Sequence, residues 1–424
     1  MIRIELKIIA PIFLIAVLFS GCKKDKLCPC DTGSDGSTDW QNIDLFDTNQ
    51  LIDIEITIHP ADWDDIRHQV RDEGSAYGPN CDQPPSNPFT YTQACITING
   101  VSIPNTIGIR KKGWFSSTET EKPSLKVKFD KYDDNVKVGG YSQFTLNNSI
   151  SDPSLIRQPL AFQVFEAAGV PTPKCNFAHV KVNGKDLGIY VLVESIDEKF
   201  LQDRYNTSEG DFFEGTESDF RNVDGWIGRF GRQTNDNIAG YGRIPNLTTA
   251  LEATDGNLVN ELDPLIDLDQ FYTYWATEVL VGHADGYAAS AANFFIYDNP
   301  ATGKFEFIPW DLDYTFDSEI DSPNGLRSVY ANAQLVRRLY LLPETRTEYL
   351  ARLDFLLNNV WIESSLNATI DSMEVVLGSH LTPSNKSEIL KVREYVDNLS
   401  SRITPELTTG TVITPEVLQS PCGN

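Results

Sequence analysis

The chain has 424 residues, a formal net charge of −25 and 41% hydrophobic residues. This hydrophobic content excludes a disordered chain, and the length is sufficient for a large core divided between two lobes or domains. The negative charge argues against a nucleic-acid partner, because nucleic acids select basic surfaces, and it suits a soluble surface outside the cytoplasm.

The first residues have the pattern of an export signal. Arg3 and Lys7 precede the apolar run IIAPIFLIAVLF, which is too short to span a bilayer comfortably, and LFSGC follows. Residues 1–21 resemble a bacterial lipoprotein signal peptide, which implies lipidation of Cys22 and a lipid membrane as partner. We expect a lipid-anchored protein of the cell envelope, at the outer membrane or cell surface. An uncleaved membrane anchor is the alternative.

Six further cysteines permit disulfides if the compartment is oxidising. Cys81 with Cys95 is the first pairing to test, because that bond would close a short Pro-rich loop, and the sequence leaves the pairing of the six cysteines open. Cys28 and Cys30 lack the histidine or second cysteine pair of a zinc site, so no metal is expected there.

The segment after the signal changes character twice. Residues 22–48 are polar and rich in Gly, Ser and Asp, which is typical of a flexible tether. Residues 51–58 alternate between apolar and polar, which predicts a strand, and 61–70 have helical spacing. Residues 71–92 are rich in Gly, Pro and Asn, which predicts an exposed loop or insertion.

Strands dominate between residues 94 and 195, where β-branched and alternating segments follow one another. One helix is predicted over 152–169, with Asp152 as its N-cap. The dipeptide Asn183-Gly184 predicts the tip of a hairpin.

The composition becomes helix-rich after residues 196–205. A long amphipathic helix is predicted over 263–282, then a strand pair, NFFIYDN and KFEFIPWD, and then several helices, the last over 388–403. We therefore predict an α+β fold of two lobes. The β-rich N-terminal lobe covers 49–200 and the helix-rich C-terminal lobe covers 201–424.

Polar residues between 280 and 316 carry the chemistry. Asp285 lies in a short loop after a helix-like run, Asn293 opens a strand, and Asp311 and Asp313 follow a second strand. Two strands would deliver these groups to a shared edge, where carboxylate and amide oxygens suit Mg²⁺ and a phosphate chain. A further carboxylate can accept the proton of an attacking hydroxyl, which indicates phosphoryl transfer.

The first lobe offers cations for the phosphates. Lys122, Lys126 and Lys128 are candidates, and the last two share one face of a strand by period-two alternation. The basic turn from Arg110 to residue 117 contains Lys112, Gly113 and Ser116, and its backbone N–H groups can cradle phosphate oxygens. No GxGxxG loop is present, and this turn is its substitute.

In chain order these elements match a protein kinase, and the motifs resemble a narrower group, the CotH (spore coat protein H) kinase family of atypical secreted kinases. The matching motifs are IGIRKKGWFSS (107–117), KPSLKVKFD (122–130), DPSLIR (152–157), VNGKDLGIYVLVESIDEKFL (182–201), HADGY (283–287) and IPWDLDYTF (308–316). The resemblance extends from about residue 50 to 408. It implies ATP and Mg²⁺ or Mn²⁺ as cofactors, and transfer of phosphate to Ser or Thr of an exported protein.

The resemblance also implies roles for individual residues. Asp285 would be the catalytic base, Asp311 would hold the metal, Asn293 would be a second ligand, and Asp313 would touch the metal directly or through a neighbour. In the family the asparagine usually lies closer to the loop aspartate, and three residues are inserted here. Lys122 best fits the family's phosphate-contacting lysine.

Glu194 ends the strand that enters the crossing segment, where backbone groups would read the adenine edge.

The alternative for the whole chain is a catalytically inactive surface adhesin or coat-assembly scaffold with the same fold. A transferase acting on a sugar or glycan is a further alternative.

Overall fold

The computed structural model describes residues 30, 39–115, 119–222, 225–234, 240–318 and 325–423. The predicted signal peptide, the predicted lipidation site Cys22 and most of the predicted tether lie outside these ranges. Within them, no helix has the length and apolar character needed to cross a lipid bilayer.

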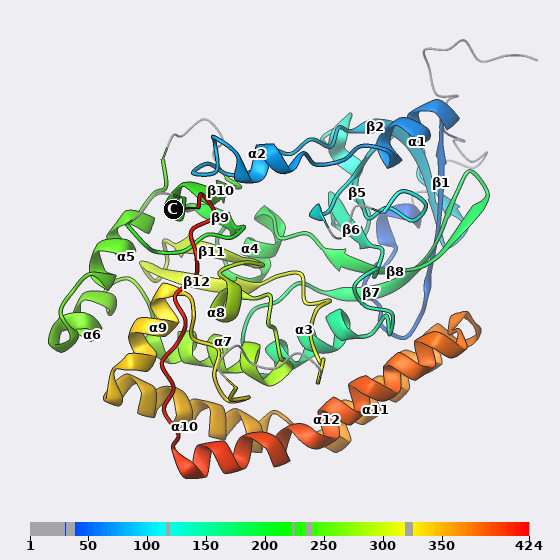
Figure 1. The fold of residues 1–424 in the computed structure, drawn as a ribbon. Helices are drawn as coiled ribbons and strands as arrows, with labels where there is room; N and C mark the ends of the chain where they lie inside the picture. Colours follow the sequence, from blue (N-terminus) through cyan, green and yellow to red (C-terminus); the bar gives the residue numbers. More distant parts are fainter. Residues whose placement is uncertain are drawn as a thin grey trace, which may run out of the picture.

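A closed β-barrel forms the N-terminal part (Figure 1). Its strands are β1 (Ile52–Ile58), β2 (Thr92–Ile98), β3 (Val101–Ser102), β4 (Ile107–Lys111), β5 (Leu125–Lys128), β6 (Gln143–Asn147), β7 (Cys175–Val182) and β8 (Lys185–Glu194). Their order is β1-β7-β8-β6-β5-β4-β2-β3, and β1 also pairs with β2, which closes the sheet. Only β1 and β7 run parallel.

The predicted alternation of the first strand is confirmed. Four isoleucines of β1 face the barrel interior, at positions 52, 54, 56 and 58, whereas Asp53, Glu55 and Thr57 face outward. Strand β5 follows the same rule, since buried Leu125 and Val127 alternate with the half-buried Lys126 and Lys128. Burial of one face of each strand fixes the register of the barrel, because a shift by one residue would expose its apolar face.

The hairpin predicted at Asn183-Gly184 is also confirmed. Val182 pairs with Lys185 across the hairpin, so Asn183 and Gly184 alone form the turn. Their φ angles are 51° and 77°. Positive φ at both positions defines the type I′ turn that asparagine and glycine favour. The Asn183 side chain also accepts a hydrogen bond from the Ile58 amide at 2.9 Å, which ties the turn to β1.

Helices α1 (Pro60–Arg67), α2 (Glu73–Tyr77) and α3 (Arg157–Ala167) belong to this half of the sequence. The prediction that a helix begins after Asp152 is wrong, because α3 begins at Arg157. Leu155 adopts a left-handed conformation with φ of 71°, which is incompatible with a right-handed helix. Buried Asp152 instead organises the turn, accepting hydrogen bonds from the amides of Ser154 and Arg157.

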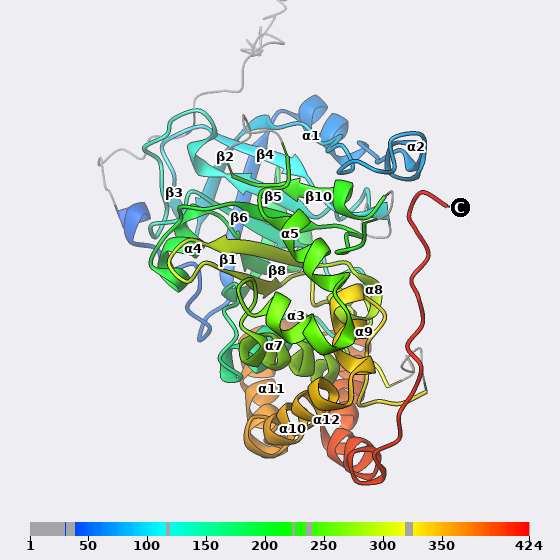
Figure 2. The same ribbon diagram turned by 90° about the vertical axis from the view of Figure 1, so that its left-hand side faces the viewer.

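The C-terminal part combines helices with a second sheet of order β10-β9-β11-β12 (Figures 1 and 2). Its strands are β9 (Phe212–Gly215), β10 (Phe230–Arg232), β11 (Phe294–Asn299) and β12 (Lys304–Pro309). Its helices are α4 (Glu198–Tyr205), α5 (Ile244–Leu251), α6 (Leu258–Leu262), α7 (Leu268–Val281), α8 (Tyr287–Ser290), α9 (Gln334–Leu341), α10 (Pro343–Asn359), α11 (Glu363–Leu377) and α12 (Pro383–Thr409). Short 3₁₀ helices cover Asp39–Asn42, Phe129–Lys131, Ile227–Arg229, Asp255–Asn257 and Gly378–His380.

Helix α7 lies at the centre of the second core, with a run of buried residues from Phe271 to Val281. Trp275 stacks on Tyr349 of α10 with ring centroids 3.6 Å apart. Asp267 caps the helix, and Gly282 ends it in a left-handed conformation, so the chain turns sharply before the predicted catalytic loop. The α+β class is as predicted, with a β-rich N-terminal region and a helical C-terminal region.

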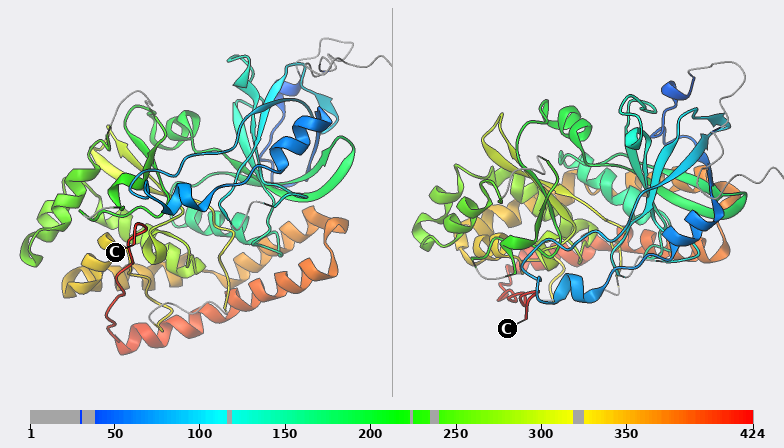
Figure 3. Two further views of the ribbon diagram at one scale, coloured as in Figure 1. Left: turned by 45° about the horizontal axis from the view of Figure 1, so that its top comes forward. Right: turned by 90° about the horizontal axis from the view of Figure 1, so that it is seen from above.

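Residues 71–89, called the strap below, join the barrel to the second half of the molecule (Figure 3). Disulfides link Cys81 to Cys422 and Cys30 to Cys95. The predicted pairing of Cys81 with Cys95 is therefore wrong. Cys95 lies on strand β2 of the barrel, whereas the strap carries Cys81 away to the C-terminal segment.

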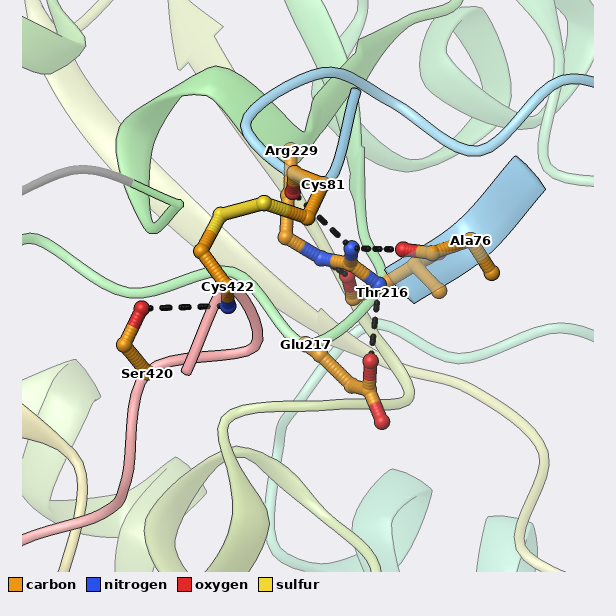
Figure 4. Close-up of a disulfide and its surroundings, with 7 residues drawn as sticks. All are labelled: Ala76, Cys81, Thr216, Glu217, Arg229, Ser420 and Cys422. Carbon is orange, nitrogen blue, oxygen red and sulfur yellow. Dashed lines mark hydrogen bonds and ion pairs between the residues drawn. A yellow bond between two sulfur atoms is a disulfide. The ribbon is translucent and has the colours of Figure 1, made fainter. Parts of the chain in front are cut away.

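A buried arginine reinforces the attachment of the strap (Figure 4). The side chain of Arg229, 0% exposed, donates hydrogen bonds to the backbone carbonyls of Ala76, Cys81 and Thr216. Its guanidinium also pairs with Glu217 at 2.7 Å. The Cys81–Cys422 disulfide and the hydrogen bonds of the Arg229 guanidinium thus attach the strap to the second half of the molecule.

Replacing both Cys81 and Cys422 by serine should destabilise the folded chain. The bond spans 341 residues, and cross-links of long loops restrict the unfolded state, typically contributing about 2–4 kcal/mol. The free energy of unfolding, measured in denaturant, should fall by that amount, and the same change at Cys30 and Cys95 is the control for a shorter loop. Equal stability of wild type and the Cys81/Cys422 variant would contradict the structural role of this bond.

Candidate active site between the lobes

A cavity of about 770 Å³ is lined by seven of the candidate residues predicted from the sequence. These are Arg110, Lys112, Gly113, Asp285, Asn293, Asp311 and Asp313. Residues from the strap, the barrel and the second sheet also line it. The remaining lining residues are Arg71, Pro85, Asn87, Phe89, Trp114, Ser151, Glu214, Thr216, Glu217, Ser290, Ala292, Trp310 and Tyr314.

Asp285 lies in the turn between α7 and α8. Asn293 donates its side-chain amide to the Asp285 carboxylate at 2.7 Å and to its carbonyl oxygen at 3.0 Å. Ala291 and Asn293 both adopt left-handed conformations, with φ of 54° and 51°. These two turns bring the asparagine side chain back to the aspartate. Burial raises the pKa of Asp285, and the nearby charge of Asp311 raises it further.

A buried glutamate that sequence reasoning missed holds this turn. Glu278, on α7, accepts hydrogen bonds from the amides of Tyr287 and Ala288, each at 2.9 Å. A Cβ at Gly286 would lie 2.4 Å from the Glu278 carboxylate and from the His283 ring, so glycine is required there. The only sequence signal was a glutamate inside an otherwise apolar helix.

Asp311 and Asp313 follow β12 and converge on one amide. The Asn147 side-chain nitrogen, at the end of β6, lies 3.5 Å from Asp311 Oδ1 and 3.3 Å from Asp313 Oδ2. Asp311 has a left-handed backbone with φ of 50°, which turns its side chain off the strand direction. Burial raises the pKa of Asp313 well above its usual range, and the neighbouring carboxylates Asp311 and Asp152 contribute.

This donor set fits a divalent cation. Two carboxylates crowded in a buried site repel each other, and a cation bound between them would remove that repulsion. Asp311, Asp313 and the amide oxygen of Asn293 are the hard oxygen ligands that Mg²⁺ and Mn²⁺ prefer. Within the described ranges, no group of three or more His, Cys, Asp or Glu residues is arranged to hold a metal, so the amide would have to contribute.

Three cations also line the cavity. The Arg71 guanidinium lies over the Trp114 ring at 4.6 Å, Arg110 lies over Tyr91 at 5.2 Å, and Lys112 lies over Trp310 at 5.5 Å. Among the described residues, none of the three cations forms an ion pair within 4.0 Å.

The carboxylate of Glu214, on β9, faces these cations. Burial raises its pKa, whereas the charges of Lys112, Lys126 and Arg110 act in the opposite direction. Glu214 and Arg71 were both missed by the sequence analysis, because neither belongs to a recognisable motif. Cations that lack ion-pair partners among the described residues give the cavity positive groups that suit an anionic ligand.

Lys122, Lys126 and Glu194 do not line the cavity. Lys122 donates to the carbonyl of Ile189 at 2.7 Å, and Lys126 donates to the Ser195 hydroxyl at 2.7 Å. Glu194, 1% exposed, pairs with the Arg204 guanidinium at 2.9 Å. All three make structural contacts, and their predicted nucleotide contacts stay predictions. Ser116 lies outside the described residues.

Comparison with known proteins places these features in context. The sequence model of the family described as CotH kinase protein matches residues 109–398. The chain is 30% identical over 196 residues to inner spore coat protein H of Bacillus subtilis strain 168, a match that covers 43% of this chain and 52% of that protein. It is 25% identical over 203 residues to invasin CotH2 of Rhizopus delemar, covering 44% and 34%. The chain thus spans about half of the first relative and a third of the second.

Two solved structures are also similar. The Helicobacter pylori proinflammatory kinase CtkA has a TM-score of 0.35 and 9% identity, covering 68% of this chain and 93% of that chain. HipA of Shewanella oneidensis MR-1, solved with HipB and operator DNA, has a TM-score of 0.36 and 12% identity, covering 68% and 65%.

The buried amine of Lys126 generates a pH prediction. Burial, with the charge of Arg110, lowers its pKa to about 7, against 10.5 for a free lysine. Between these values the unfolded chain binds the additional proton, so this group makes stability rise with pH across that window. Lys126→Met should therefore stabilise the fold most below pH 7 and progressively less toward pH 10. Denaturant unfolding at pH 6 and pH 9 measures this, and a pH-independent difference would contradict the shift.

Proposed function

Because the chain belongs to the CotH kinase protein family, we propose that it is a metal-dependent kinase that acts on exported proteins. It would transfer the γ-phosphate of ATP to a serine or threonine hydroxyl. The observation that carries this proposal is the cavity itself, which brings cations without ion-pair partners among the described residues together with a group of carboxylates. A metal-bound triphosphate has the matching distribution, because its phosphates need cations and its metal needs carboxylates.

The carboxylates and the cations of the cavity would have distinct roles. Asp311, Asp313 and Asn293 would hold a divalent cation, which neutralises charge on the phosphates when bound. Arg110 and Lys112 would bind phosphate oxygens from the barrel side. Positioning and charge neutralisation of this kind supply most of the catalysis in phosphoryl transfer.

Asp285 would act at the acceptor. Its carboxylate is fixed by Asn293, so one oxygen is oriented while the side chain stays within the cavity. The raised pKa makes the carboxylate a better proton acceptor than a solvent-exposed aspartate. The incoming hydroxyl would lose its proton to this group as the oxygen attacks phosphorus.

The second candidate is a catalytically inactive surface adhesin or coat-assembly scaffold. Two observations favour it: the described residues hold no cluster of three metal-binding acids or histidines, and one relative is named as an invasin. The hydrogen bond from Asn293 to Asp285 favours the enzyme instead, because an inactive scaffold does not need an oriented aspartate in the cavity.

Nucleotide binding separates the two candidates. A kinase should gain stability from Mg²⁺–ATP by mass action, about 2.7 kcal/mol at a hundredfold excess over Kd. Lys112→Met should reduce this gain, because it removes a cation from the cavity wall while leaving the fold intact. Thermal unfolding with and without Mg²⁺–ATP measures the shift, and no shift with any nucleotide or divalent metal would support the scaffold.

Phosphoryl transfer is tested with γ-labelled ATP and exported proteins of the source organism. Asp285→Asn and Asp311→Asn should each reduce labelling at least about 100-fold, since the first removes a general base and the second a metal ligand. Asp371→Asn is the matched control, because this carboxylate pairs with Arg393 on the surface of α11, outside the cavity. Equal labelling by wild type and Asp285→Asn would contradict the assigned role.

A further inference from the structure

The strand order assigns an unexpected residue to the position of the kinase lysine. In protein kinases, the strand directly before the regulatory helix carries a lysine that pairs with a glutamate of that helix. Here the strand directly before α3 is β6, with β7 and β8 following the helix. Strand β6 reads QFTLN and has no lysine. Its last residue is Asn147, and the facing residue of α3 is Gln158.

Asn147 and Gln158 are paired and buried. Asn147 is 5% exposed and Gln158 2%, and the amide nitrogen of the first lies 3.3 Å from the amide oxygen of the second. The same nitrogen lies 3.3 Å from Asp313 and 3.5 Å from Asp311. The two N–H groups of this neutral amide, on the barrel, thus lie within reach of three acceptors, one on helix α3 and one on each carboxylate that follows β12.

We propose that Asn147 and Gln158 form a neutral counterpart of the kinase lysine–glutamate pair, in which Asn147 positions Asp311 and Asp313 for a divalent cation. This inference rests on the proposed function and assigns Asn147 a positioning role. An ammonium group in this place would form ion pairs with the two aspartates and compete with the metal. An amide donor orients the carboxylate oxygens and leaves their negative charge available.

The positive charge normally supplied by that lysine then has to come from elsewhere. Arg110 and Lys112 lie at the end of β4, two strands away from β6 in the sheet, and both line the cavity. Neither forms an ion pair among the described residues. Strand β6 would therefore supply the amide that orients the two aspartates, and the end of β4 would supply the positive charge for the phosphates.

The adjacent residue offers a matched control. Asn148 is 2% exposed and, like Asn147, its side-chain oxygen accepts a backbone amide two residues ahead. Its amide nitrogen, however, donates to the carbonyl of Lys122 at 2.8 Å, away from the two aspartates. Asn147→Ala and Asn148→Ala thus each remove one turn contact, but only the first removes the donor to Asp311 and Asp313.

The test is the affinity of the purified chain for Mn²⁺, measured by electron paramagnetic resonance of the free ion. Loss of a group that orients metal ligands typically weakens binding about 10- to 100-fold. Asn147→Ala should therefore weaken Mn²⁺ binding at least about 10-fold, whereas Asn148→Ala should stay within about 2-fold of wild type. Gln158→Met, which keeps the side-chain length, should weaken binding by an intermediate factor.

Four results would overturn the inference. Wild-type affinity in a folded Asn147→Ala variant would remove the positioning role, and equal weakening by Asn147→Ala and Asn148→Ala would reduce it to turn stability. Wild-type affinity in Gln158→Met would show that Gln158 takes no part in positioning the metal ligands. This variant tests the inference if Asn147→Ala does not fold. A wild-type chain that binds no Mn²⁺ would instead overturn the proposed function along with this inference.

Discussion

One cavity that brings cations and carboxylates together is the feature on which the proposed function depends. The chain carries a net charge of −25, yet Arg71, Arg110 and Lys112 line this cavity and form no ion pair among the described residues. Asp285, Asp311 and Asp313 line the same cavity. Charges that are partly removed from water without partners are costly, so a ligand that carries both phosphates and a metal would lower the free energy of this arrangement.

Different elements hold the groups of the cavity in place. The barrel fixes β4 and β6 through its closed register, and α7 fixes the Asp285 turn through buried Glu278. The strap contributes Arg71 and Phe89 to the cavity but has only one short helix of its own. The Cys81–Cys422 disulfide and Arg229 attach the strap to the second half of the molecule and so help to keep these two residues at the cavity.

Local patterns predicted the parts of the structure that local physics controls. The alternating isoleucines of β1 and the Asn183-Gly184 turn were predictable, because strand burial and positive φ leave direct traces in the sequence. The motifs around Asp285 and Asp311 placed both residues in one cavity correctly. The partners of Cys81 and Cys95 were not predictable, because disulfide partners depend on how distant segments meet in space. Asn147 was overlooked for the same reason, since only the strand order brings it to Asp311.

A crystal structure of the chain with Mn²⁺ and a non-hydrolysable ATP analogue tests the central claim most directly, because anomalous scattering locates the metal without assumptions about the ligand. The account predicts a Mn²⁺ peak coordinated by Asp311 and Asp313, with the triphosphate extending toward Arg110 and Lys112. A metal peak elsewhere, or a nucleotide bound outside this cavity, would contradict it.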